Sequence, residues 1–187
     1  MRGVNADSPT SKQANDEAHQ AAVNLHAGFG TVDDIRTLIA ACDASPGNPD
    51  YDLAAAWERV AAAQSEEEAA AIQAEIAAAV GDSHTWQNAI RVGLQQLNPE
   101  DPDLWEWALE NGHADLAAAS PHTPFRRLVQ LACMRGPAAR QARKTLAEGG
   151  GQNIDVEAWQ LAASLAEQGS SFDETWTVLD SLYDLGE

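Results

Sequence analysis

The chain has 187 residues, enough for one domain or two small ones with a real hydrophobic core, and it carries 29 carboxylates against 11 lysines and arginines. Hydrophobic residues make up 44 % of the chain, which excludes wholesale disorder, and no apolar run approaches the roughly 18 residues of a membrane span. The first thirteen residues lack the apolar stretch of a secretory signal, so we expect a cytoplasmic protein.

Helix signals occur along almost the whole chain. Alanine, the residue with the highest helix propensity, occurs 37 times, and no useful stretch shows the two-residue alternation of a strand. We therefore predict an all-α protein of about ten short antiparallel helices, in an irregular bundle or a short array of helical hairpins. The predicted helices are 12–27, 31–42, 50–64, 65–80, 83–97, 102–111, 113–119, 124–135, 137–148, 154–168 and 172–185.

Capping residues predict several of the helix ends. A hydroxyl residue followed three positions later by a carboxylate makes a capping box, and a proline fits the first turn of a helix. The boxes are Ser65 with Glu68, Ser171 with Glu174 and, more weakly, Thr31 with Asp34, and the prolines are Pro102, Pro124 and Pro137. Gly81 predicts the end of the helix that begins at Ser65, and the residues from Asp43 to Asp50 predict a loop.

The domain organisation follows from these elements. We expect a disordered tail over residues 1–11 and a single helical domain over 12–187, with a sub-boundary near 98–101 between two helical halves. Trp57 precedes the cap at Ser65 and Trp159 precedes the cap at Ser171, which suggests degenerate helical hairpins. The two spacings differ, so there is no fixed repeat period.

A small-residue helix, a Pro-x-Thr-Pro turn and a second short helix follow one another over residues 117–132. This segment resembles one unit of the variant leucine-rich repeats, and the wider segment 101–148 resembles HEAT-like units if the flanking helices are included. The resemblance implies a helical scaffold that binds other macromolecules, and it names no catalytic residue. Tandem copies of the unit are absent from the sequence.

Charge is segregated along the sequence. Residues 121–147, here called the basic island, hold six cations and no carboxylate, whereas residues 1–120 hold 20 carboxylates against five cations and residues 148–187 hold nine against none. Nucleic-acid binding needs a dominant positive field, so we expect no DNA or RNA partner. The island either pairs with carboxylates of the same chain, or joins two copies in a homo-oligomer, or contacts an anion. Its candidate residues are Arg126, Arg127, Arg140, Arg143 and Lys144.

No motif for catalysis, phosphate binding or metal binding occurs in the sequence, so we expect no catalytic residue, no cofactor and no metal. Cys42 and Cys133 are predicted to be reduced thiols in the core. Trp107 lies about 130° around its helix from the apolar stripe of its neighbours. Either that helix is sandwiched between neighbours, or Trp107 is exposed among carboxylates and suits a partner's arginine or lysine.

These observations favour a non-enzymatic module whose acidic helical surface engages a basic protein, as inhibitors, immunity proteins, DNA mimics and acidic chaperones do. The predicted contact residues are Glu66, Glu67, Glu68, Asp101, Asp103, Glu106, Trp107 and Glu110. One alternative is a structural or adaptor scaffold whose acidity serves only solubility. Another is an enzyme with an unrecognised site of Asp, Glu and His residues.

Overall fold

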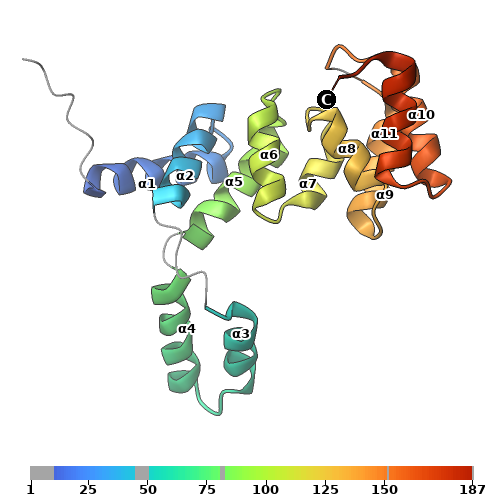
Figure 1. Cartoon of the computed structure of the whole chain (residues 1–187). Helices are drawn as coiled ribbons and strands as arrows, with labels where there is room; N and C mark the ends of the chain where they lie inside the picture. Colours follow the sequence, from blue (N-terminus) through green and yellow to red (C-terminus); the bar gives the residue numbers. More distant parts are fainter. Residues whose placement is uncertain (1–10, 45–50, 81–82, 151, 187) are drawn as a thin grey trace, which may run out of the picture. The chain divides into compact units, whose positions relative to one another are not determined.

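The computed structural model describes residues 11–44, 51–80, 83–150 and 152–186, and all regular elements in these ranges are helices (Figure 1). The predicted all-α fold is confirmed. The chain divides into two compact units, residues 1–97 and residues 98–187, and each is described by itself. The predicted single domain with a boundary near 98–101 stays a prediction, as do the antiparallel order of the helices and the hairpin array.

The first unit contains five of the described helices. They are α1 (Ser11–Ala27), α2 (Val32–Ala44), α3 (Leu53–Ala62), α4 (Glu66–Val80) and α5 (Ser83–Leu97). Helices α1, α2 and α5 pack against one another around fully buried side chains that include Leu25, Ile35 and Leu94. Gly93 permits this packing, because a Cβ atom there would lie 2.9 Å from side-chain carbons of both Leu25 and Ile35.

Helices α3 and α4 pack against each other around a much smaller apolar cluster. Its buried members are Ala56, Ile72 and Ile76, with Tyr51 and Val60 packed against them. Alanine fills about half of the remaining positions in these two helices. Since alanine buries little area per side chain, this pair gains less hydrophobic stabilisation than a pair built on leucine would.

The second unit contains six of the described helices. They are α6 (Pro102–Glu110), α7 (Ala114–Ala119), α8 (Phe125–Ala132), α9 (Pro137–Glu148), α10 (Val156–Glu167) and α11 (Phe172–Tyr183). Helix α9 packs against α7, α8 and α10, and α11 packs against α8 and α10. Trp159 is fully buried at the centre of this core, with the ring centroid of Phe125 5.0 Å from its own.

The turn between α7 and α8 is fixed by side chains of the second unit. The buried Thr123 hydroxyl donates to the carbonyl of Ala117 at 2.6 Å, and the Gln152 amide donates to the carbonyls of Pro121 and Thr123 at 2.7 and 2.6 Å. The Gln152 carbonyl accepts the N–H of Phe125 at 2.9 Å, which satisfies an N–H at the start of α8. Helix, turn and helix therefore follow one another here, as the sequence over 117–132 predicts.

Each predicted helix is present, and the predicted ends differ from the observed ones by at most three residues. The capping box of Ser171 with Glu174 forms in both directions, whereas Glu68 accepts the N–H of Gln64 rather than that of Ser65. Helix α8 ends at Ala132 rather than at 135, because the chain turns before Pro137 through Gly136, whose φ is 106°.

Some predictions fall on other parts of the chain. Of the tail predicted over 1–11, residues 1–10 lie outside the described residues, and Ser11 begins α1. The helix end at Gly81 and the loop over 45–50 also lie outside them, while Asp43 belongs to α2. In the described ranges, no helix has both the length and the apolar character that crossing a membrane requires.

Candidate partner-binding surfaces

The acidic residues predicted for the second unit lie on and just before α6. The Asp101 side chain accepts the N–H of Asp103 at 3.0 Å and so caps the helix, with Pro102 in its first turn. Leu104, Trp105 and Ala108 are buried in the unit. The exposed carboxylates of α6 are Asp103 and Glu110, at its two ends.

Trp107 is half-buried, and its ring stacks on that of His113 with centroids 5.9 Å apart and an interplanar angle of 28°. Its indole is therefore partly covered by the chain itself. An aromatic anchor for a partner works best when most of its surface is free before binding. Trp107 consequently offers a partner less surface than the exposed indole that the sequence allowed.

Glu106 is paired with the basic island. Its Oε1 accepts a hydrogen bond from Arg127 Nε at 2.7 Å, and the guanidinium Nη2 of Arg127 also contacts it. The hydrogen bond to Glu106 is the main cause of the raised pKa of Arg127, and the charges of Glu106 and Glu110 add to it. This is the internal pairing that the sequence offered as one alternative for the island, and here it joins α6 to α8.

Other cations of the island also have partners within the second unit. Arg143 donates from Nε to the carbonyl of Ala132 at 2.8 Å and from Nη2 to that of Met134 at 3.1 Å, so it caps the C-terminal end of α8. The Nζ atom of Lys144 lies 3.8 Å from Oε1 of Glu148. Arg140 is exposed, and no acceptor or carboxylate among the described residues contacts it. Three of the island's six cations, Arg127, Arg143 and Lys144, are therefore engaged by oxygen atoms of the second unit.

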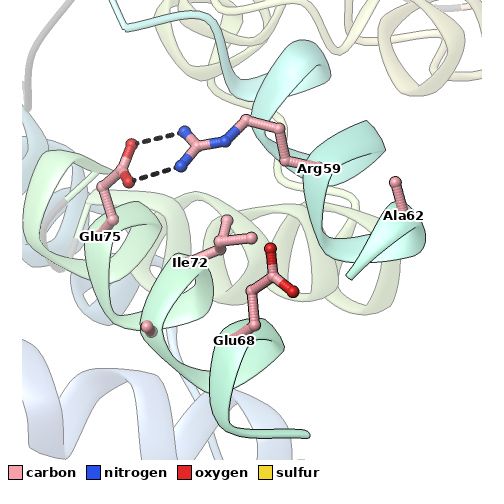
Figure 2. Close-up of a pocket in the computed structure, with 6 residues that line it drawn as sticks. Arg59, Ala62, Glu68, Ile72 and Glu75 are labelled. Atoms are coloured by element: carbon pink, nitrogen blue, oxygen red, sulfur yellow. Dashed lines mark hydrogen bonds and ion pairs between the residues drawn. The ribbon is translucent and has the colours of Figure 1, made fainter. Parts of the chain in front are cut away.

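The other predicted acidic residues, Glu66, Glu67 and Glu68, form the first turn of α4 and are exposed. Beside them, α3 and α4 border an open pocket of about 350 Å³ (Figure 2). Figure 2 shows Arg59 of α3 reaching across to Glu75 of α4, with two guanidinium nitrogens 2.9 and 3.0 Å from the two carboxylate oxygens. This bidentate pair closes one side of the pocket.

The Arg59–Glu75 pair is extended by the Tyr51 hydroxyl, which donates to Glu75 at 3.1 Å. The hydrogen bond from Arg59, followed by that from Tyr51, lowers the pKa of Glu75. The pKa of Arg59 is raised, mainly by the same hydrogen bond. The pKa of Tyr51 is raised as well, first by desolvation and then by the bond to Glu75. These contacts favour the charged forms of Arg59 and Glu75, and they link α3 to α4.

Exposed aromatic side chains elsewhere were missed in the sequence reasoning. Trp57 on α3 keeps 50 % of its surface exposed, although Trp159, its counterpart in the suggested hairpins, is fully buried. Helical phase alone does not predict this exposure, because it places Trp57 about 60° from Val60. In the structure Ala56 and Val60 occupy the inward positions of α3, and Trp57 lies about 100° further round from Ala56.

Phe29 is 83 % exposed in the turn between α1 and α2. The N–H of Phe29 bonds to the carbonyl of Asn24 and that of Gly28 to the carbonyl of Leu25, which is a Schellman motif. In that motif the residue after the glycine usually packs against one of two residues, which here are Asn24 and Val23. Asn24 is polar and Val23 is itself 47 % exposed, so Phe29 keeps most of its surface exposed.

In the described part of the chain, no three His, Cys, Asp or Glu residues lie in a group that could hold a metal ion. The two cysteines are free thiols. Cys42 is buried as predicted, whereas Cys133 is only half-buried and lies 3.5 Å from the Thr175 hydroxyl.

Comparison with protein-family models, with curated proteins and with solved structures gives no significant match. The resemblance of residues 117–132 to a variant leucine-rich repeat stays an interpretation of the sequence.

Proposed function

We propose that the protein is a non-enzymatic binding module whose acidic helical surface engages a basic protein. The observation that carries this proposal is the charge of the α3–α4 pair: residues 51–80 hold six carboxylates and one cation, Arg59, and that cation is already bound to Glu75. The exposed side chains of Glu58, Glu66 and Glu67 contact no cation or donor among the described residues.

Trp57 supplies the apolar part of the proposed contact. A half-exposed indole on the same helix as Glu58 suits an arginine or lysine side chain, which can stack on the ring while its charge faces carboxylates. Tryptophan is also among the residues that contribute most to binding when a partner covers them. In the other unit, Asp103 and Glu110 of α6 form a second acidic surface. Glu106 of the same helix is already paired with Arg127.

The chain carries far more negative charge than its own cations can neutralise, and this excess supports a contact with a cationic partner. Even if each of the 11 cations paired with one carboxylate, 18 of the 29 carboxylates would have no cation of the chain. Such a field accelerates the encounter with a cationic partner and disfavours anionic ones. The proposed location, the cytoplasm, rests on the sequence alone.

The test is differential capture from an extract of the source cells, followed by affinity measurement on each captured protein. The double variant E66Q/E67Q removes two charges from α4, and E157Q/E167Q removes two exposed charges from α10 as a matched control. We expect a basic partner that binds the wild type and the control equally and binds E66Q/E67Q roughly fivefold more weakly, at about 0.5 kcal/mol for each exposed pair. Equal loss in both double variants would show that only net charge matters and would contradict this surface.

A further inference from the structure

A cavity of about 260 Å³ opens in the second unit beside the start of α8 and the indole of α11. Its apolar walls are Phe125, Ile154, Trp176 and Leu185, of which Phe125 is buried and the others are half-buried. A space of this size with three or four apolar walls accommodates a small branched or aromatic group.

Arg126 lines this cavity, and its guanidinium group lies over two aromatic rings of α11. Its guanidinium carbon lies 5.0 Å from the ring centroid of Trp176 and 5.9 Å from that of Phe172. Within the described ranges, no hydrogen-bond acceptor or carboxylate contacts this guanidinium. Stacking on a ring fixes the plane of the fork but uses none of its N–H groups, so they stay available to an acceptor.

The other polar side chain of the cavity is already satisfied. Both donors and the acceptor of the Gln152 amide are engaged by the backbone of the α7–α8 turn and of Phe125. Two carboxylates of α11 are engaged in local contacts, since Glu174 accepts the N–H of Ser171 and Asp180 accepts that of Gly186. The positively charged N–H donors of Arg126 therefore remain available to a ligand at this cavity.

We propose that this cavity binds a carboxylate attached to a small apolar group, with the carboxylate on Arg126 and the apolar group against Trp176 and Ile154. A carboxylate matches the planar fork through two parallel hydrogen bonds. A phosphate dianion fits less well, because a single cation in mostly apolar walls leaves its further oxygens without donors. The site is separate from the acidic surface of α3 and α4, and the proposal does not depend on it.

The test uses N-acetyl-leucine as the probe and N-acetyl-leucinamide as its uncharged analogue, followed through the indole N–H resonance of Trp176 in the full chain. We expect saturable binding of the carboxylate in the millimolar range and at least about tenfold weaker binding of the amide. Two further arms separate the sources of such a group: an acetylated tetrapeptide that ends in leucine, and free 4-methylpentanoate. Tighter binding of the tetrapeptide would identify the ligand as a peptide C-terminus, and tighter binding of 4-methylpentanoate would identify it as a small free acid.

Variants assign the binding to Arg126. R126Q should abolish the preference for carboxylate over amide, and R126K should retain the preference with several-fold weaker binding, because the ammonium keeps the charge but not the fork. R140Q removes an exposed cation outside the cavity and should bind like the wild type. Equal binding of carboxylate and amide, absence of saturable binding, or an unchanged preference in R126Q would each overturn the proposal.

Discussion

The cationic side chains of the basic island differ in their contacts, although they lie close together in the sequence. Arg143 and Arg140 lie three residues apart on α9, yet Arg143 donates to the carbonyls of Ala132 and Met134 at the end of α8 while Arg140 stays in solvent. A cation at a helix C-terminus also interacts favourably with the helix dipole. Arg143 is therefore a structural residue, and Arg140 is free for other roles.

Replacing Arg143 with glutamine should lower the free energy of unfolding by about 1–2 kcal/mol, since charge-assisted bonds to two carbonyls are lost. R140Q on the same helix should change it by less than about 0.5 kcal/mol. Urea denaturation of the two variants measures both values. Equal effects would show that the cap contributes nothing beyond the charge.

The Arg59–Glu75 pair makes the stability of the fold depend on pH. Because Arg59 lowers the pKa of Glu75, R59Q should raise that pKa toward its ordinary value, as measured by the pH titration of the Glu75 carboxyl carbon in NMR spectra. A depressed folded-state pKa stabilises the fold above the unfolded value of 4.5, and this contribution is lost as the pH falls through the folded-state pKa. The wild type should thus lose more stability than R59Q on acidification below about pH 4.5. An unshifted Glu75 titration in R59Q would contradict the pairing.

Helices in this protein are specified mainly by their ends and by small residues at close contacts. Gly93 is unfavourable for an isolated helix, yet in α5 it leaves the space that Leu25 and Ile35 occupy. Ile35 is fully buried, and its contacting atom is not at the end of the side chain, so the core has little freedom to move away.

Replacing Gly93 with alanine should therefore destabilise the first unit. The overpacking costs about 1–3 kcal/mol and the gain in helix propensity returns about 1 kcal/mol, so we expect a net loss of up to about 2 kcal/mol. N88A changes an exposed residue of the same helix and should raise stability by about 0.5 kcal/mol. Thermal unfolding of both variants decides the matter, and a G93A protein as stable as N88A would exclude the close approach.

The positions of the helices could be predicted from the sequence because caps, prolines and glycines act locally. The Ser171–Glu174 box and Pro137 are examples in which the predicted and observed starts agree. Contacts between helices could not be predicted in this way. The pairing of Glu106 with Arg127, and the cavity beside Arg126, join residues 21 or more positions apart, and periodicity within one segment does not say which other segment it packs against.

At the scale of the whole molecule, the charge distribution is the property from which the proposed function follows. Two of the six cations of the basic island, Arg127 and Lys144, contact carboxylates of the second unit, whereas the α3–α4 pair of the first unit holds six carboxylates against Arg59 alone. Trp57 is the aromatic side chain that the sequence reasoning did not select, because its exposure depends on which face α3 turns toward α4.

A contact centred on Trp57 should lose affinity when the ring is removed. W57A should weaken binding of the captured basic protein roughly 30-fold, about 2 kcal/mol, as for a central aromatic anchor. W107A, which removes the half-buried indole of α6, should have a much smaller effect on the same affinity. The dissociation constants of both variants, with circular dichroism as the folding control, provide the comparison. A larger effect of W107A would place the contact on α6 instead.

The salt dependence of the affinity between the wild-type chain and that basic protein directly tests whether charge carries the contact. Raising the salt from about 0.05 M to about 0.5 M shortens the Debye length from about 14 Å to about 4 Å. If charge steers the contact, the association rate and the affinity should fall together, each by about tenfold or more. An affinity that is the same at both salt concentrations would show that the charge serves solubility alone, and would favour the adaptor scaffold.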